Sequence, residues 1–353
     1  MYHKKHIAPS NITAKESLER INNLNLDKVL FLIDEQKKLV GSLTDGDLRR
    51  GLLSDLTIND LALEFAQKRP AFINASNISV NSIMSLRKEF EIVPVLNDNM
   101  NIVDIINFRI QSSYLPVDAV VMAGGLGSRL KPLTNNTPKP LLKVGNKSSI
   151  QHNIDRLSKF GIKNYFFCLN HMKEKIEDHL NEIYIQEQDL GFKLTYVHEK
   201  FAMGTIGAIS LIKNFKNDSI LLTNSDVITK LDYEQFFLDF EKKNADLSMI
   251  TIPYSINIPY GVTSIETSDN SIVSLDEKPN YTHYCNAGIY LLKKSIISEI
   301  PKNKYFNATD LVKVLINNNK YKVISYPTHD YWRDIGSIED FNQANEDIKN
   351  LSL

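Results

Sequence analysis

The sequence predicts an α/β protein in which a mostly parallel sheet has helices on both faces and follows a small α+β domain. Short apolar runs alternate with amphipathic helical stretches over residues 119–252, an order typical of a parallel sheet. The first 115 residues instead repeat a shorter pattern of helix, strand, strand and helix. A chain of 353 residues is long enough for two domains, which we place at residues 1–115 and 117–350.

The elements follow from periodicity and from turn residues. In the first domain the helix beginning near residue 45 has Thr44 or Asp45 as its cap, and Pro116 breaks the pattern in a short linker at 111–117. We expect helices within 11–25, 45–50 and 78–90, and strands at 29–33, 92–96 and 102–107. In the second domain we expect strands at 119–122, 165–169, 194–197, 220–223 and 247–252, and helices at 150–160 and 173–183. Hairpin-like strands at 261–265, 272–277 and 287–292 are expected to form a lid or wall for a second substrate.

A glycine-rich loop follows the first strand of the second domain. Bare backbone N–H groups beside fixed positive charges suit a polyphosphate, so the loop predicts chemistry on a nucleoside triphosphate. The residues expected to bind the nucleotide here are Ala123, Gly124, Gly125, Gly127 and Ser128, followed by the cation Arg129 and later by Lys131 and Lys139.

Two better-known glycine loops are excluded. No Gly-Lys-Ser/Thr occurs, as a P-loop requires, and the third glycine of a dinucleotide fingerprint is replaced by Leu130. The string from Gly124 instead resembles the signature GGxGxRLxPLT, followed by PKPL, of the sugar-phosphate nucleotidyltransferases, with Ser128 where Thr is commoner. The resemblance implies a Rossmann-like, glycosyltransferase-A-like sheet.

Two aspartates are the candidate metal ligands. Asp226 follows the apolar run 219–224, and Asp334 lies in the string YWRDIG. The resemblance implies that both bind Mg²⁺, and that Arg129, Lys139 and Asp226 are catalytic; prolines on both sides of Lys139 stiffen its backbone. Alternatives are that Asp226 caps a turn, that Asp334 pairs with Arg333 at the surface, and that Lys131 is simply solvated.

Two further segments are expected to recognise the base and the sugar phosphate. The string from Glu199 through Gly204 and Thr205 resembles the E-x4-GTAGA segment of the guanylyl branch, which favours GTP because a carboxylate accepts from the donors of guanine. A surface position for Glu199 is the alternative. The resemblance also implies that Glu277, Lys278, Asn286 and Gly288 bind the sugar phosphate.

The repeated pattern of the first domain resembles a pair of CBS motifs, which often bind adenine nucleotides. The first copy has Gly41, Thr44 and Asp47 in the family's Gly-x-x-Thr-x-x-Asp pattern, so the resemblance implies nucleotide binding by Thr44 and Asp47. The alternative is that both residues only cap a helix. In the second copy Ile110 replaces the carboxylate that would hold a ribose.

A CBS pair ahead of a transferase domain resembles the glucosamine-1-phosphate guanylyltransferases of bacterial legionaminic-acid biosynthesis. We therefore expect Mg²⁺-dependent transfer from GTP to glucosamine 1-phosphate. Alternatives are UTP, dTTP or CTP as donor, mannose or heptose 1-phosphate as acceptor, and a CBS-based nucleotide sensor whose transferase domain is inactive.

The composition of the chain argues against nucleic acid and membrane partners. A net charge of −1 without long basic runs argues against nucleic acid, and no apolar run approaches membrane-spanning length. The amino terminus lacks the apolar core of a signal peptide, so the cytoplasm is the expected location. Cys168 and Cys285 lie in apolar runs and are expected to be buried thiols. CBS pairs often dimerise, so a homo-oligomer is expected.

Overall fold

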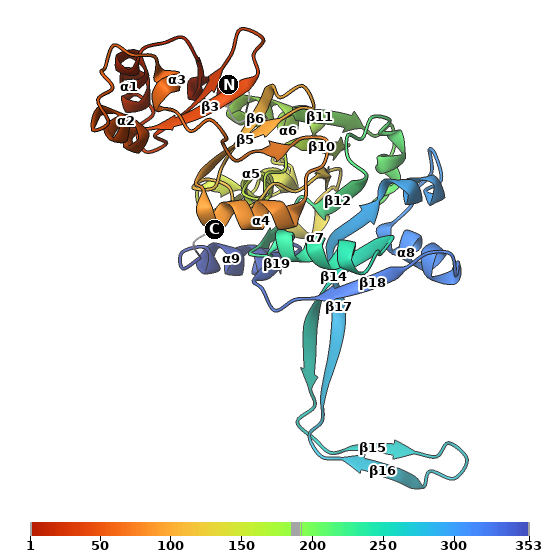
Figure 1. Ribbon diagram of the computed structural model, residues 1–353. Helices are drawn as coiled ribbons and strands as arrows, with labels where there is room; N and C mark the ends of the chain where they lie inside the picture. Colours follow the sequence, from red (N-terminus) through yellow and green to blue (C-terminus); the bar gives the residue numbers. More distant parts are fainter. Residues whose placement is uncertain (1, 185–190, 192, 352–353) are drawn as a thin grey trace. The chain divides into compact units, whose positions relative to one another are not determined.

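The computed structural model describes residues 2–184, 191 and 193–351, which belong to two compact units (Figure 1). No helix among these residues is long and apolar enough to cross a lipid bilayer. Unit 1 comprises residues 1–118, 154–165 and 174–195, and unit 2 comprises residues 119–153, 166–173 and 196–353. Unit 1 thus includes three segments, 117–118, 154–165 and 174–195, that the sequence analysis placed in the second domain.

Unit 1 contains two three-stranded sheets with the same pairing. In the order β1-β2-β3 the first pair is parallel and the second antiparallel, and β4-β5-β6 repeats this arrangement. Each antiparallel pair has a bulge at the corresponding place, after Leu32 and after Val95. The internal repeat predicted from the sequence is therefore present. The strands are β1 (Ile7–Pro9), β2 (Val29–Ile33), β3 (Leu39–Thr44), β4 (Ile73–Asn74), β5 (Ile92–Leu96) and β6 (Ile102–Asn107).

The second copy of the repeat lacks the helix that was expected at its end. The described residues between β6 and β7, 108–116, form no helix, so the prediction of a complete second round is wrong there. The side-chain oxygen of Asn107 accepts a hydrogen bond from the Arg109 backbone N–H (2.9 Å), which forms a turn, and Pro116 comes too soon for a helix to develop. The helices before that point are α1 (Ala14–Asn22), α2 (Asp45–Leu52), α3 (Ala62–Phe65) and α4 (Val80–Glu89).

A seven-stranded sheet has the order β11-β10-β7-β12-β17-β14-β18. The backbone N–H of Ala123 donates to Cys168 O (2.9 Å) and that of Ser225 to Met122 O (3.1 Å), so the carboxyl ends of neighbouring strands meet as in parallel pairs. Among the described strands of this sheet, β17 is the one that runs antiparallel to its two neighbours, and the predicted mostly parallel sheet is confirmed. The strands are β7 (Val117–Met122), β10 (Asn164–Leu169), β11 (Lys193–His198), β12 (Ser219–Asn224), β14 (Leu247–Asn257), β17 (Asn280–Lys293) and β18 (Val323–Pro327).

Helices cover both faces of this sheet, as expected. Leu311 of α8 (Ala308–Asn317) belongs to the core on which Val323 of β18 packs. The ring of Phe236 in α7 (Tyr233–Lys242) lies 5.2 Å from that of Tyr326, which is three residues from Val323 and therefore on the other face. The remaining elements are η1 (Tyr2–His6), η2 (Ser128–Leu130), η3 (Lys139–Leu141), β8 (Lys143–Val144), β9 (Lys147–Ser148), α5 (Ser149–Ser158), α6 (Lys173–Tyr184), η5 (Gly207–Leu211), β13 (Val227–Thr229), β15 (Val262–Ile265), β16 (Ile272–Asp276), η6 (Lys294–Glu299), β19 (Trp332–Asp334) and α9 (Ile338–Asp347).

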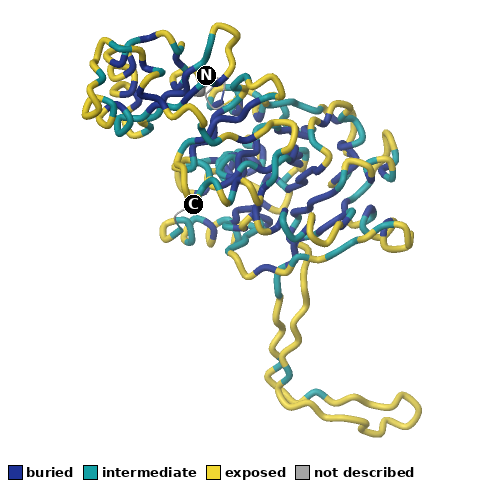
Figure 2. Tube along the Cα trace, viewed as in Figure 1, coloured by how far each residue is buried: buried dark blue, intermediate teal, exposed yellow. Residues whose placement is uncertain are grey.

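The strands β14 and β17 continue beyond the sheet as a two-stranded ribbon, which the β15–β16 hairpin extends (Figures 1 and 2). We call residues 254–286 the arm. Every arm residue is exposed except Ile258, Val262 and Pro279, which are half-buried. The expectation that Cys285 is buried is wrong because β17 is longer than the core beneath it, whereas Cys168 is buried as predicted.

Candidate active site

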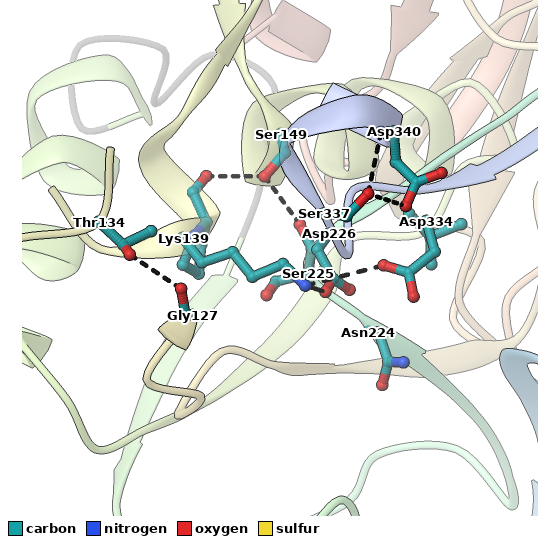
Figure 3. A network of polar contacts seen from close by, with 12 residues as sticks. Gly127, Thr134, Lys139, Ser149, Asn224, Ser225, Asp226, Asp334, Ser337 and Asp340 are labelled. Atoms are coloured by element: carbon teal, nitrogen blue, oxygen red, sulfur yellow. Dashed lines mark hydrogen bonds and ion pairs between the residues drawn. The ribbon is translucent and has the colours of Figure 1, made fainter. Parts of the chain in front are cut away.

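The predicted phosphate loop follows β7, a strand that is buried along its whole length. Gly127 has a φ of +62°, and a Cβ at this position would lie 3.0 Å from Lys139 Cβ and 3.0 Å from Thr134 Cγ2. The Thr134 hydroxyl also donates to Gly127 O (2.8 Å, Figure 3). The loop is thereby packed against the segment that carries Lys139, and only glycine fits at this point.

The two candidate metal ligands meet because of a short strand pair. Asp226 directly precedes β13, and β13 pairs antiparallel with β19 so that Val227 lies opposite Asp334. The Ile335 backbone N–H donates to Asp226 O (2.9 Å), which extends the ladder by one step. Two carboxylates that are distant in the sequence therefore face one another at the edge of the loop.

Lys139 lies beside both carboxylates (Figure 3). Its ammonium forms an ion pair with Asp226 and is 3.7 Å from Asp334 Oδ1. Burial raises the pKa of Asp334 to about 6, and the negative charge of Asp226 contributes to the rise. The alternative that Asp334 forms a surface pair with Arg333 is wrong, because Arg333 instead donates to Asp347 (2.9 Å).

One oxygen of each aspartate accepts no hydrogen bond. Asp226 Oδ1 and Asp334 Oδ1 are buried and accept no hydrogen bond from any described residue. A buried acceptor without a donor costs about 1–3 kcal/mol, so such atoms indicate a missing cation or donor. Within the described chain no cluster of three or more His, Cys, Asp or Glu side chains could hold a metal. An ion here would take two protein carboxylates and complete its coordination with phosphate and water oxygens, the usual arrangement for Mg²⁺.

Two buried polar residues at the start of α5 hold the segments that carry these groups. The Ser149 hydroxyl lies 3.0 Å from Pro140 O, next to Lys139, and 3.1 Å from Ser225 O, next to Asp226 (Figure 3). Asn153 Nδ2 donates to Val227 O (2.9 Å). The sequence analysis missed both residues. The sequence could have pointed to Asn153, because this polar residue lies at a position of its helix whose spacing predicts the buried face.

Glu199 lies on the side of the site expected to recognise the base. It is only 9% exposed, so the alternative of a surface position is wrong. Its Oε2 accepts from the Met203 backbone N–H (3.0 Å), while a Cβ on Gly124 would lie 3.0 Å from Oε1. One carboxylate oxygen is therefore fixed by the chain, and the other faces the phosphate loop.

Gly204 and Thr205 join this side of the site to α8. Gly204 has a φ of +78°, and a Cβ there would lie 2.5 Å from Phe306 O. The Thr205 hydroxyl accepts from the Ala308 backbone N–H (2.9 Å), and the Thr205 backbone N–H donates to Asn307 Oδ1 (3.2 Å). The side chain and backbone of Thr205 therefore hold the start of α8. Gly204 and Thr205 also line the pocket described next.

These groups surround a pocket of about 440 Å³, within the usual size range of ligand sites. Its lining includes residues that the sequence analysis missed, above all Asn224 and the exposed Tyr305. A larger depression of about 710 Å³ runs along α9, but no cation lines it. The pocket brings together the predicted residues Gly124, Gly125, Gly127, Ser128, Arg129, Lys139, Glu199, Gly204, Thr205 and Asp226.

A model of the family described as "Nucleotidyl transferase" matches residues 118–350, well over half of the chain. The chain belongs to this family. This nucleotidyltransferase is 28% identical over 236 residues to the mannose-1-phosphate guanylyltransferase of Mycobacterium tuberculosis, covering 66% of this chain and 64% of that protein. It is 30% identical over 237 residues to the bifunctional protein GlmU of Methanocaldococcus jannaschii, covering 65% of this chain and 54% of that protein. The match spans less than two thirds of either relative.

Solved structures agree with the family assignment. HddC from Yersinia pseudotuberculosis is 28% identical to the nucleotidyltransferase with a TM-score of 0.51, and the match covers 66% of this chain and 99% of HddC. A second structure of HddC, complexed with GMP-PN, matches with 26% identity and a TM-score of 0.51, over the same shares of the two chains.

The other predicted residues of the nucleotidyltransferase lie outside the pocket lining. Ala123 and Asp334 adjoin the lining residues Gly124 and Gly336. A Cβ on Gly288 would lie 2.6 Å from Asn224 Nδ2, so Gly288 reaches the edge of the pocket. Asn286 is nearby, and its Nδ2 is 2.6 Å from the Tyr290 hydroxyl. The structure does not bring Glu277 and Lys278 to the pocket, because both lie farther out on the exposed arm.

Thr44 and Asp47 form a capping box at the start of α2, in unit 1 of the nucleotidyltransferase. The Thr44 backbone N–H (2.8 Å) and the Thr44 hydroxyl (2.5 Å) both donate to Asp47 Oδ2, while Arg50 donates to Asp47 Oδ1 (2.5 Å). The capping alternative therefore describes what these residues do in this structure. Both oxygens of Asp47 already have donors, and nucleotide binding by the pair stays a prediction.

Proposed function

We propose that this nucleotidyltransferase joins a nucleoside triphosphate and a sugar 1-phosphate into a nucleotide sugar, with release of pyrophosphate. The observation that carries the proposal is the pair of buried oxygens on Asp226 and Asp334 that accept no hydrogen bond, beside Lys139 and a glycine loop. A sugar phosphate is already anionic at neutral pH, so the reaction needs little proton transfer. What it requires is positioning and charge stabilisation, which this set of groups can supply.

In the proposed reaction a phosphate oxygen of the sugar 1-phosphate attacks the α-phosphorus of the triphosphate. The bond from that phosphorus to the oxygen bridging to the β-phosphate breaks, and pyrophosphate leaves with the electron pair. The backbone from Gly124 to Gly127 and the Arg129 guanidinium hold the triphosphate, and Lys139 stabilises charge on the transferring group. Asp226 and Asp334 would hold Mg²⁺, which when bound neutralises charge on the phosphates.

We propose GTP as the donor. Because Met203 occupies one oxygen of Glu199, the other is available to accept hydrogen bonds from the N1–H and amino group of guanine. The names of the guanylyltransferase relatives and of the HddC structure complexed with GMP-PN support the same base. Glucosamine 1-phosphate remains our proposed acceptor on the architecture of the chain, and mannose 1-phosphate is the acceptor that the relatives' names favour.

Pyrophosphate release over a substrate panel tests this proposal. GTP, ATP, UTP, dTTP and CTP are each paired with glucosamine, mannose and heptose 1-phosphates, in Mg²⁺ and in EDTA. We expect the highest kcat/KM with GTP and glucosamine 1-phosphate and no release in EDTA. A folded, Mg²⁺-supplied sample that turns over no pair would contradict the proposal. Adenine-nucleotide binding by such a sample, measured by titration calorimetry, would favour the sensor alternative.

For unit 1 we propose a CBS pair, on the strength of its two equivalent sheets. An adenine nucleotide that used Asp47 for its ribose would share that carboxylate with Arg50 and Thr44. If the pair regulates transfer, AMP or ATP should change the rate of pyrophosphate release. An unchanged rate with binding established would remove the regulatory part of the proposal.

A further inference from the structure

The residues expected to bind the sugar phosphate leave the acceptor side of the pocket short of polar groups. Glu277 and Lys278 lie on the exposed arm, outside the pocket lining. Asn286 already uses its side-chain amide within the chain, because Oδ1 accepts from the Gly288 backbone N–H (2.9 Å) and Nδ2 lies 2.6 Å from the Tyr290 hydroxyl. A sugar carries several hydroxyl groups, so its recognition requires a side chain in the pocket that is still available to bind one.

Asn224 has an unused side-chain amide in the pocket. It is the last residue of β12 and lines the pocket together with the phosphate loop. Ile220 and Leu222, which precede it on the same face of the strand, are buried in the core, so the alternation predicts another apolar residue at this position. Asn224 is half-buried, and its amide makes no hydrogen bond with any described residue (Figure 3). A primary amide offers both a donor and an acceptor, the two functions that a hydroxyl group also has.

The neighbouring strand leaves room for this amide. β12 and β17 pair as far as Thr223 and Ile289, and Asn224 and Gly288 are the next residues along. A Cβ on Gly288 would lie 2.6 Å from Asn224 Nδ2, and the φ of Gly288 is +73°. Any larger residue at 288 would therefore displace the amide and also strain the backbone. The place of the Asn224 side chain is thus built into the sheet.

The order of the strands argues that this amide meets the acceptor and not the base. Glu199 follows β11, the phosphate loop follows β7, and Asn224 ends β12, in the sheet order β11-β10-β7-β12-β17. Neighbouring strands are about 4.8 Å apart, so three steps place Glu199 and Asn224 about 14 Å from one another, with the loop between them. A base at Glu199 and a triphosphate at the loop leave the side of β12 and β17 for the molecule that attacks the α-phosphorus.

We propose that the side-chain amide of Asn224 binds a hydroxyl group of the acceptor sugar and so contributes to the choice of sugar. The inference rests on the proposed function, since a sugar 1-phosphate as acceptor is what brings hydroxyl groups to this side of the pocket. Asn224→Ala removes the amide without adding a charge, and it leaves Asp226, Asp334 and Lys139 in place. A hydrogen bond between neutral groups makes a modest net contribution, so the expected loss of acceptor affinity is about 10-fold.

The first test measures acceptor binding without turnover. The full chain, with Mg²⁺ and a GTP analogue whose α–β bridge is a methylene group, is titrated calorimetrically with glucosamine 1-phosphate and with mannose 1-phosphate. We expect Asn224→Ala to bind the sugar phosphate about 10-fold more weakly than wild type and to bind the GTP analogue equally well. Asn319→Ala, at an exposed position outside the pocket lining, is the matched control and should behave as wild type.

The possible outcomes of this titration separate the two proposals. Equal binding of the sugar phosphate by wild type and Asn224→Ala would overturn the present inference and leave the proposed function standing. Weaker binding of the GTP analogue by Asn224→Ala would place the amide on the nucleotide or its metal ion, which also overturns the inference. A wild type that binds neither sugar phosphate would contradict the proposed function, and the inference would fall with it.

The second test changes the substrate and identifies the hydroxyl group. Pyrophosphate release is measured with the 3-deoxy, 4-deoxy and 6-deoxy analogues of both sugar phosphates. In wild type one analogue should lose about 10-fold in kcat/KM relative to its parent, and in Asn224→Ala the same analogue should lose nothing further, because either change removes the same hydrogen bond. The other two analogues should lose equally in both proteins. Equal losses in wild type and variant for all three analogues would overturn the inference.

Discussion

Two clusters in this molecule combine aspartate with a cation and differ in how completely the oxygens are used. In unit 1, Asp47 accepts from the backbone and hydroxyl of Thr44 and from Arg50, so each of its oxygens has a donor. In unit 2, Asp226 and Asp334 share Lys139, and each has a buried oxygen without a donor.

The difference separates a cap from a candidate reaction centre. A saturated carboxylate at a helix start, whose two oxygens both have donors, stabilises the fold without needing a ligand. Two adjacent half-buried carboxylates that each keep a buried oxygen without a hydrogen-bond donor instead cost stability until a cation or donor arrives. The residue types alone did not distinguish the clusters, since both match family motifs. The bonding of each oxygen does distinguish them.

The largest expected effect comes from removing one charge of the unsaturated cluster. Asp226→Asn or Asp334→Asn keeps the shape of the side chain but removes the negative charge, so we expect kcat/KM to fall about 1,000-fold. Asp232→Asn is the matched control: Asp232 caps α7, and asparagine caps a helix equally well. Steady-state pyrophosphate release measures all three. A rate for both site variants within a few-fold of the control would break the assignment.

A smaller effect on kcat/KM is expected at Glu199, which has only one carboxylate oxygen available to a ligand. Glu199→Gln can still accept from Met203 through its amide oxygen, but the other position becomes an NH₂ that faces the donors of guanine. We expect kcat/KM for GTP to fall about 100-fold, with no comparable loss for ATP. Kinetics with both nucleotides check this. An equal loss for the two would show that Glu199 supports the pocket without recognising the base.

The pH dependence of stability should also come from the unsaturated cluster. The pKa of Asp334 is raised from the usual 3.8 to about 6, so the folded chain binds this proton more tightly than the unfolded chain. The resulting stabilisation is present below about pH 4 and is lost as the pH rises through about 6. We therefore compare the thermal unfolding of Asp334→Asn and wild type in EDTA at pH 5 and at pH 7. The increase in Tm that the variant shows over wild type should be about 2–4 °C larger at pH 7 than at pH 5. A difference that does not change with pH would contradict the raised pKa.

Much of this arrangement could be predicted because it follows from local rules. The bounds of β2, β5 and β6 match the apolar runs that predicted them. Asp226 was expected near the phosphate loop because it follows a buried strand, and carboxyl ends of parallel strands meet at one edge. Asp334 was placed with it by resemblance alone, since nothing in YWRDIG predicts pairing with β13.

The rest depends on long-range contacts that local patterns do not encode. Ser149 and Asn153 look like ordinary polar residues of a helix start, and only the fold shows that they bond to carbonyls beside Lys139 and Asp226. The hairpin spacing predicted strands near 261–277 but not that β14 and β17 leave the sheet. For the same reason Cys285 was expected in a core that does not reach it.

The smallest expected effect tests the saturated cluster. Thr44→Ala removes one cap, and Thr13→Ala removes the equivalent capping box of α1, formed with Glu16, so each should lower the free energy of unfolding by about 1 kcal/mol. Denaturant titration measures that loss, and neither variant should change pyrophosphate release. Because the two caps are built alike, calorimetry with ATP or AMP separates their roles. If Thr13→Ala still binds the nucleotide but Thr44→Ala does not, Thr44 binds the nucleotide as well as capping α2. If both variants bind the nucleotide equally, Thr44 only caps the helix.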